Sequence, residues 1–580
     1  MRAASRHLRR VLAGTNLHPG PPPPAGEGEG PRRVRRAMGL CAAVAAALFA
    51  LAAPAPSRAE DRAALMERHR GGTLRLLSRA SAGTIDPQRN YTAQYWQVFA
   101  AVYDGLVAFR KAPGRAGGEI VPDLADAVPT AEDDGLTYRF RLRPGVRFSD
   151  GGPVRPSDAA ASFRRIFRVL SPTAEGFYGA IAGADACLRA PETCALEGVQ
   201  ADDAAGTVVI HLTRPDPEFL LKLALPHASV LPEHAPPRDA GTTPLPGTGP
   251  YAIASYDPGA RMRLVRNPHF REWSADAQPD GFPDEVHYDF GFEDVAEVTM
   301  VQRGQADWMF DTPPADRLGE LGARHAGQVH LNPANAIWYV PMNVNLPPFD
   351  DVRVRRAVNL AIDRRAAVKL FGGGALAAPL CQVLPPGLPG HEPHCPYERD
   401  LERARALVAD AGATGRSVTL ITDDSAVQRA LGTLLQDALR DIGLDARTRA
   451  LSASVQFTYI QNSANRVGIS LTSWYADYPS PNVLLGLLFG CATFRPESDS
   501  SPNISGFCDP ALDARMRAAL HAPDPAEAAR LWAAVDRAVT DAAPAAVLFT
   551  PRYIDFVSAR VGRFLYHDQV HWLFTQSWVR

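Results

Sequence analysis

One short run of residues combines side chains that could bind a small charged molecule. It is Trp474-Tyr475-Ala476-Asp477-Tyr478-Pro479-Ser480-Pro481, where one carboxylate stands among three aromatic rings with no basic residue to neutralise it. In a site shielded from water, a charge-assisted hydrogen bond from an amino group to Asp477 would contribute about 1.5–3 kcal/mol, and cation–π attraction would add to it. We therefore interpret Asp477 as a binding residue for a cation, with Trp474, Tyr475 and Tyr478 around it.

The same residue types are also typical of a surface turn. Asp, Pro and Ser favour turns, as does the nearby Asn482, and residues 483–489 that follow are apolar and suit a core. The run by itself leaves both interpretations open.

The sequence does not carry the motifs of common enzyme chemistries. We find no nucleophile elbow, zincin helix or dinucleotide fingerprint, and Gly372-Gly373-Gly374 lacks the Lys and Ser/Thr of a phosphate loop. A triad assembled from distant residues stays open, because geometry and not chain order defines it. We expect a protein that is not an enzyme and has no cofactor, with a hydrolase as the alternative.

Length and charge narrow the class of protein. The 580 residues exceed a single hydrophobic core, so two or more lobes are expected. The 61 basic residues are offset by 63 acidic ones, for a net charge of −2, which leaves no basic excess for nucleic acid.

The N-terminal region has the pattern of an export signal. Arg32, Arg33, Arg35 and Arg36 precede the apolar run 38–53, and Ser57-Arg58-Ala59 places small residues at both positions of a cleavage site. The apolar run is shorter than the roughly 20 residues of a membrane span. We predict cleavage near Ala59 and a periplasmic mature chain of the Gram-negative type.

Six of the seven cysteines follow this signal and fall in neighbouring pairs. In an exported protein such pairs predict disulfides, here Cys187 with Cys194, Cys381 with Cys395, and Cys491 with Cys508. Alternatively, Cys395 could bind a metal ion together with His391 and His394 instead of forming a disulfide. Pro393 opposes the helical register of a zincin and Cys381 offers Cys395 a partner, so we expect no metal.

Short β-type runs alternate with amphipathic helical patterns, which predicts an α/β fold. We expect Ser157 to cap a helix whose apolar face extends to Leu170, and Pro551 to end a strand over 547–550. Asp350 or Asp351 should cap a further helix, with arginines on the solvated outer side of this region at Arg353, Arg355, Arg356, Arg364 and Arg365. Other expected strands and helices cover 72–77, 136–142, 208–212, 338–344, 401–411, 418–422, 431–442 and 531–539.

Several segments taken in order are similar to those of one family. They are Gly71–Leu74, Tyr103–Leu106, Pro122–Ala125, Leu142–Gly151, Gly247–Tyr251, Arg266–Pro268, Asn343–Ala361 and Trp474–Pro481. Together they resemble the extracellular solute-binding proteins of the oligopeptide, dipeptide and nickel class, which deliver ligands to ABC importers.

The resemblance implies a two-lobed α/β fold of the periplasmic binding protein type II kind, with a two-strand hinge and a subdomain inserted in lobe I. Lobe I would take residues 60–95, 240–336 and 546–580, the insert 96–239 and lobe II 337–545, after an extension and signal at 1–59. The hinge strands would lie near 339–344 and 547–550.

The same resemblance implies that Asp477 pairs with the α-ammonium of a short peptide, beside Trp474. The peptide would be captured between closing lobes and delivered to the permease subunits of an ABC importer. We expect a monomer without nucleic acid. A nickel chelate, with His391 and His394 as the hint of metal, an opine or a sugar are the alternative ligands.

Overall fold

The computed structural model describes residues 58–580. Two compact units are distinguished, 1–64 and 65–580, and the first is described only at its end, where helix α2 (Arg58–His69) begins. The predicted signal and the residue that precedes Arg58 in the cleavage site lie outside the described residues. In residues 58–580 no helix combines the length and the apolar character needed to cross a membrane.

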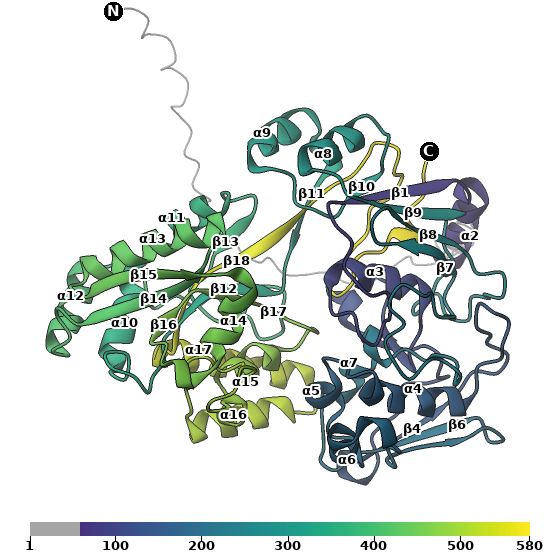
Figure 1. Ribbon diagram of the computed structural model, residues 1–580, viewed down its shortest axis with the longest axis horizontal. Helices are drawn as coiled ribbons and strands as arrows, with labels where there is room; N and C mark the ends of the chain where they lie inside the picture. The colour runs from purple at the N-terminus through teal and green to yellow at the C-terminus, as the bar shows by residue number, and fades with distance from the viewer. Residues whose placement is uncertain (1–57) are drawn as a thin grey trace, which may run out of the picture. The chain divides into compact units, whose positions relative to one another are not determined.

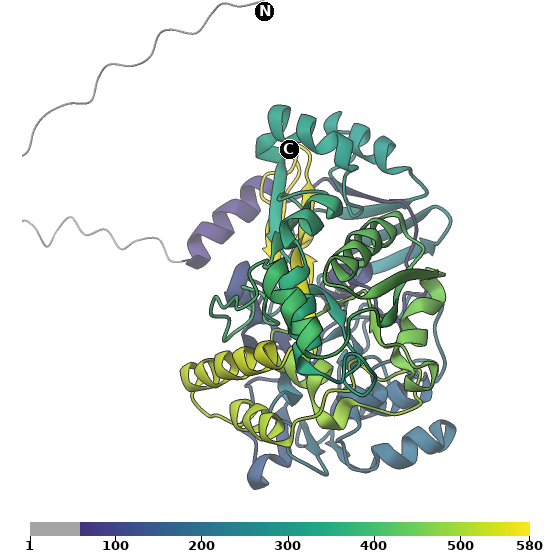
Figure 2. The same ribbon diagram turned by 90° about the vertical axis from the view of Figure 1, so that its left-hand side faces the viewer.

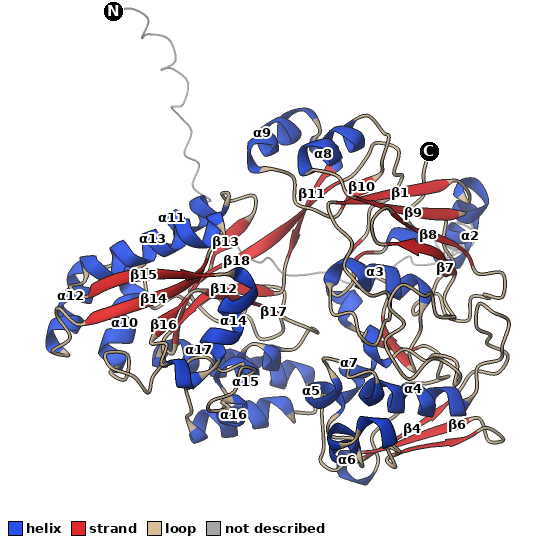
Figure 3. Cartoon of the chain, in the orientation of Figure 1, coloured by secondary structure: helices blue, strands red, loops and turns tan. Residues whose placement is uncertain are grey.

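Strands and helices alternate along much of the second unit (Figure 3), which confirms the α/β prediction. The helices are α3 (Ala93–Val102), α4 (Pro156–Arg168), α5 (Ala174–Tyr178), α6 (Ala184–Arg189), α7 (Phe219–Leu223), α8 (Asp294–Gln302), α9 (Ala315–Arg324), α10 (Val352–Ala361), α11 (Arg364–Phe371), α12 (Leu401–Asp410), α13 (Ala426–Asp441), α14 (Ala453–Gln461), α15 (Leu485–Phe489), α16 (Pro510–Leu520) and α17 (Pro525–Ala542). The strands are β1 (Thr73–Ser78), β2 (Val107–Phe109), β3 (Ile120–Pro122), β4 (Thr137–Arg141), β5 (Val199–Asp202), β6 (Thr207–His211), β7 (Tyr251–Asp257), β8 (Arg261–Arg266), β9 (Glu285–Phe290), β10 (Trp308–Met309), β11 (Val329–Pro333), β12 (Ala336–Pro341), β13 (Ala377–Pro379), β14 (Ser417–Asp423), β15 (Asp445–Leu451), β16 (Ile469–Ser470), β17 (Thr472–Tyr475), β18 (Ala545–Phe556), β19 (Tyr566–His567) and β20 (His571–Trp572).

Four larger sheets and two two-stranded ones, β2-β3 and β19-β20, form in the described residues. One five-stranded sheet has the order β10-β1-β9-β8-β7, and the parallel set β15-β14-β16 has helices α10 to α13 gathered about it (Figure 3). A third sheet is β4-β6-β5, and the central sheet is β11-β18-β12-β17, with β13 also paired to β18. Helices α16 and α17, yellow-green in Figure 2, lie side by side and add buried side chains such as Met516 and Trp532 to one apolar core.

The two predicted hinge segments are neighbours in the central sheet. Strands β12 and β18 pair antiparallel, with Tyr339 opposite Val547 (Figure 1). The prediction that Pro551 ends the second strand is wrong, because β18 continues to Phe556. Pro551 lies where β18 changes partner from β12 to β11, and its carbonyl accepts from the Ala334 amide, so its missing N–H costs no ladder hydrogen bond.

The prediction of a solvated arginine face is also wrong in part. Arg355 and Arg364 are buried, and their guanidinium groups donate to backbone carbonyls, Arg355 to Ala543 and Arg364 to Val547. Burial lowers the pKa of Arg364 to about 10. Five fixed donors let a guanidinium satisfy several carbonyls at once, so Arg355 attaches α10 to the end of α17 and Arg364 attaches α11 to β18.

Helix caps were predicted with mixed success. Asp351 caps α10 by accepting from the Arg353 amide, as expected. Ser157, however, lies inside α4, where its hydroxyl donates to Asp203, while Arg155 occupies the cap position. Leu170 follows the end of α4, where its own left-handed backbone (φ 54°) turns the chain, and its side chain is 63% exposed.

The three predicted disulfides are confirmed. Cys187–Cys194, Cys381–Cys395 and Cys491–Cys508 are bonded, with Cα–Cα distances of 4.4, 5.3 and 4.5 Å.

Candidate ligand-binding site

The Trp474–Asp477 segment sits at one side of the central sheet. Strand β17 pairs with β12, Tyr475 opposite Ala336, and the Ala476 amide continues the ladder by donating to the Asn335 carbonyl at 2.8 Å. Among the described residues no strand pairs with the other side of β17. Backbone groups that precede Asp477 are therefore free on one side for an added strand.

Asp477 is held by a residue from the N-terminal part of the unit. The hydroxyl of Tyr91 donates to Asp477 Oδ1. Burial raises the pKa of Asp477 to about 6, and the Tyr91 hydrogen bond opposes that rise because it favours the charged carboxylate. In the part of the chain that the structure describes, no arginine, lysine or histidine forms an ion pair with this carboxylate.

The segment that carries Tyr91 is fixed by the residue before it. The Asn90 side-chain amide donates to the Ala82 and Thr84 carbonyls, each at 2.7 Å, and its oxygen accepts from the Thr92 amide at 3.0 Å. These bonds set the turn that leads into α3 and place the Tyr91 ring 5.3 Å from His227 and 5.8 Å from Trp96, between ring centres. Burial lowers the pKa of His227 to about 3, so this ring is neutral and brings no cation to Asp477.

Two tyrosines beside Asp477 reach solvent. Tyr91 is 43% and Tyr475 46% exposed, and they are the aromatic members of the exposed large hydrophobic side chains in the described residues. Burial nevertheless raises the pKa of both phenols. Asp477 therefore has one solvent-exposed tyrosine as its hydrogen-bond donor and a second two residues before it in the chain.

The other two predicted side chains face different surroundings. Trp474 is partly buried, and its ring centre lies 6.0 Å from that of Phe457, on the face of β17 opposite to Tyr475. Tyr478 is 4% exposed and donates to Glu218 at 3.0 Å. The structure thus places Tyr475 at the surface near Asp477 and adds Tyr91 as the hydrogen-bond partner of Asp477. No sequence pattern selects Tyr91, because Asn90-Tyr91-Thr92 is typical of an ordinary turn.

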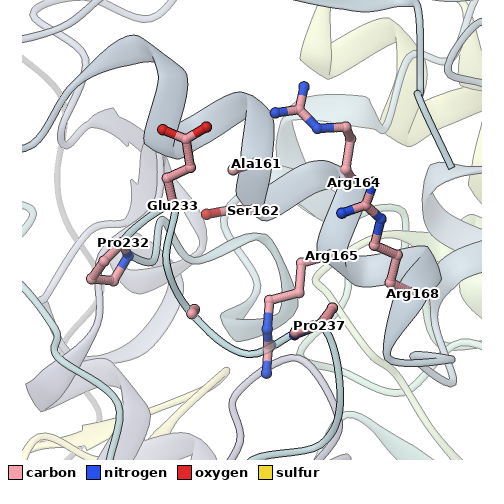
Figure 4. A pocket seen from close by; sticks show the side chains of 9 residues that line it. Ala161, Ser162, Arg164, Arg165, Arg168, Pro232, Glu233 and Pro237 are labelled. Carbon is pink, nitrogen blue, oxygen red and sulfur yellow. The ribbon is translucent and has the colours of Figure 1, made fainter. Parts of the chain in front are cut away.

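A second pocket lies elsewhere, between α4 and the loop 232–237. It has a volume of about 140 Å³, and Figure 4 shows Glu233 on one wall and Arg164 on another. Arg165, which also lines it, directs its donors inward to Asp86, Gln88 and two backbone carbonyls. Because none of its lining residues belongs to the Asp477 segment, we treat this pocket as separate from the candidate site.

The residues of the metal alternative have other partners. Cys395 is in a disulfide, His391 Nδ1 lies 2.8 Å from the Leu384 carbonyl, and His394 Nε2 lies 3.6 Å from Asp541. Among the described residues no group of three His, Cys, Asp or Glu side chains is arranged to hold a metal ion.

Residues 119–495 match the family described as bacterial extracellular solute-binding proteins, family 5, middle. This range covers more than half of the chain. The chain belongs to family 5 of the bacterial extracellular solute-binding proteins.

Named relatives of this family 5 protein agree with that assignment. A glutathione-binding protein, GsiB, of Salmonella paratyphi A is 28% identical over 464 residues, which cover 77% of this chain and 83% of the relative. The periplasmic oligopeptide-binding protein OppA of Escherichia coli K12 is 25% identical over 513 residues, covering 86% and 89%. These relatives are binding proteins by name.

Solved structures confirm the two-lobed fold of the family 5 protein. The clavulanic acid biosynthesis oligopeptide binding protein 2 is similar with a TM-score of 0.80 and 26% identity, over 88% of this chain and 96% of that one. The murein tripeptide binding protein MppA in its unliganded open form has a TM-score of 0.70 at 23% identity, over 87% and 97%.

Proposed function

We propose that this family 5 protein is the periplasmic substrate-binding component of an ABC importer and captures short peptides through their free amino terminus. The names of relatives support a peptide ligand, since they include glutathione-binding, oligopeptide-binding and, from Pseudomonas aeruginosa, probable di/tripeptide-binding proteins. The protein would be exported by the signal at 32–59, act as a monomer and deliver its ligand to membrane permease subunits.

The observation that carries this proposal is the Asp477 carboxylate, which has no cationic partner among the described residues, accepts from the exposed Tyr91 and follows the exposed Tyr475 by two residues. An α-ammonium supplies the missing positive charge, and it can interact with both a carboxylate and an aromatic face. One charge-assisted hydrogen bond is worth about 1.5–3 kcal/mol, and an aromatic face adds about 0.5–1 kcal/mol at an exposed site.

The unpaired side of β17 supports a peptide in preference to a simple amine. A peptide whose ammonium lies on Asp477 can extend along this strand and exchange backbone hydrogen bonds with it. Such bonds do not depend on side-chain identity. We therefore expect a binder that accepts varied sequences and demands a free amino terminus.

The mechanism is capture followed by closure. Asp477 follows a strand of the central sheet, and Tyr91 belongs to the segment that leads into α3, so the site is complete only when these two parts meet. To change a closed population from 1:99 to 99:1, a ligand must prefer the closed state by about 5.5 kcal/mol. The ammonium bond, engaged where water is excluded, supplies part of that preference.

The test is isothermal titration calorimetry of Ala-Ala-Ala and its N-acetylated form. We expect the wild type to bind the free-amine peptide and Asp477→Asn to lose about tenfold to a hundredfold of that affinity, as one charge-assisted bond predicts. Asp437→Asn, an exposed acid on α13, is the matched control and should bind normally. Equal affinity for the acetylated peptide would overturn the proposal and favour a nickel chelate, an opine or a sugar.

A hydrolase is distinguished in the same experiment. Mass spectrometry of the peptide recovered from the titration cell should find it intact, whereas shorter fragments in proportion to time would identify an enzyme.

A further inference from the structure

The hydrogen bonds of one carboxyl group, Glu218, join the inserted subdomain to the Asp477 segment. Glu218 immediately precedes α7 and is 4% exposed. Its own position is set by Asp216, which accepts from the Glu218 amide at 3.1 Å and pairs with Lys222 at 2.6 Å. The turn that carries Glu218 is therefore held by a hydrogen bond and an ion pair.

Both hydrogen-bond partners of Glu218 belong to the segment that follows β17, far from Glu218 in the sequence. The Tyr478 hydroxyl and the Asn482 side-chain amide donate to the same oxygen, Oε2, at 3.0 and 2.8 Å. They lie 260 and 264 positions away in the sequence. Tyr478 is the residue after Asp477, so a contact made by Tyr478 acts directly on the ligand-binding segment.

The partners are themselves held in one turn. Ser480 accepts from the Asn482 amide at 3.2 Å at the start of the short helix Pro481–Val483, which keeps Tyr478 and Asn482 on the same side of the segment. Phe177 of the insert packs edge-on against the Tyr478 ring, with 6.0 Å between ring centres. A solvent-exposed pair, Arg495 with Glu175 at 3.7 Å, lies at the rim.

The second oxygen of Glu218 has no hydrogen-bond partner. Oε1 is buried, and among the described residues no cation forms an ion pair with this side chain. A buried polar atom without a partner is costly, so separation of the contact would let water solvate this oxygen and offset part of the two hydrogen bonds that are lost.

We propose that Glu218 is the closure latch of this binding protein: the insert grips Tyr478 and Asn482 when the lobes close on a ligand and releases them when the lobes open. The proposal rests on the proposed function for the identity of the ligand. It makes Glu218 a positioning residue, which acts on the ligand through the Asp477 segment and without touching it.

The test compares Glu218→Ala and Glu218→Gln with the control Glu192→Ala, an exposed glutamate of the same subdomain. Stopped-flow binding of Ala-Ala-Ala should give a dissociation rate at least tenfold higher for Glu218→Ala, with an association rate within about threefold of wild type. Glu218→Gln, which keeps one acceptor oxygen, should recover most of the loss. Preference for the free amine over the acetylated peptide should not change, because Asp477 is intact.

A structural role would give a different result. If Glu218→Ala lowers the melting temperature of the unliganded protein and both rate constants fall together, the residue only supports the fold and the latch is wrong. Small-angle scattering at saturating Ala-Ala-Ala adds a direct readout of lobe closure: the radius of gyration of liganded Glu218→Ala should stay larger than that of liganded wild type. An unchanged radius together with an unchanged dissociation rate would overturn the latch even if Asp477 proves to bind the ammonium.

Discussion

Tyr91 and Asp477 are separated by 386 positions in the sequence, yet the phenol of the first donates a hydrogen bond to the carboxylate of the second. The bond joins the turn before α3 to the segment after β17. In the proposed function an ammonium binds the same carboxylate, and the phenol would then tune that carboxylate as a second hydrogen-bond partner.

Tyr91→Phe isolates this tuning, since it removes the hydroxyl and keeps the ring against His227 and Trp96. A hydrogen bond to the charged form lowers the pKa of an acid, so its loss should move the pKa of Asp477 above its value of about 6. We expect affinity for Ala-Ala-Ala to fall about fivefold below pH 6, in line with one hydrogen bond of about 1 kcal/mol, and to approach wild type at pH 8. Calorimetry at several pH values measures this. An equal loss at every pH would show that Tyr91 contacts the ligand instead.

Binding itself should depend on pH in wild type. With a pKa of about 6, Asp477 is mostly charged at pH 7 and mostly protonated at pH 5, so affinity for a free-amine peptide should fall about tenfold between them. Above about pH 8 the peptide ammonium loses its proton and affinity should fall again. Titrations from pH 4.5 to 9 should therefore give a bell-shaped profile. A flat acid limb would contradict the role of Asp477.

Asp477→Asn should stabilise the unliganded protein, although it weakens peptide binding. The folded pKa of Asp477 is raised by burial above its unfolded value, so the folded state binds the extra proton and wild type loses stability as pH rises from about 4 to 6. The variant has no proton to lose, and its advantage should grow by about 1.4 kcal/mol per pH unit across that window and then level off. Urea unfolding at pH 4, 5, 6 and 7 checks this. An advantage that is constant across pH would mean that charge burial is not its cause.

Much of the fold was predictable because its signals are local. Helix α10 follows from a capping aspartate and apolar residues at helical spacing, and the cysteines lie close enough in sequence to indicate their partners. The errors came where a distant element supplied the partner. Arg355 and Arg364 look like surface cations in sequence, and only the carbonyls of the chain near β18, about 185 positions away, make them interior residues.

The site was predictable in the same measure. Asp477 stands out as an acid among aromatic residues, which is a local pattern. Tyr91 and Glu218, which contact the Asp477 segment, lie in turns with no distinctive composition. No local sequence pattern relates them to a segment more than 250 residues away. Tertiary contact alone selects them.

Two adjacent arginines on α4 provide a final contrast. Arg165 is buried and donates to Asp86, which is fully buried, as well as to Gln88 and the carbonyls of Pro236 and Arg238. Its neighbour Arg164 is partly buried, and burial together with Arg168 lowers its pKa. Arg165→Ala should lower the free energy of unfolding by about 3–5 kcal/mol, because it leaves the Asp86 charge buried without its partner. Arg164→Ala should change it by no more than about 0.5 kcal/mol, since no buried network depends on it. Urea denaturation of the two variants measures the difference in the free energy of unfolding. Similar losses for both variants would mean that removal of either cation weakens α4 in the same way. The Asp86 network would then not be the source of the stability.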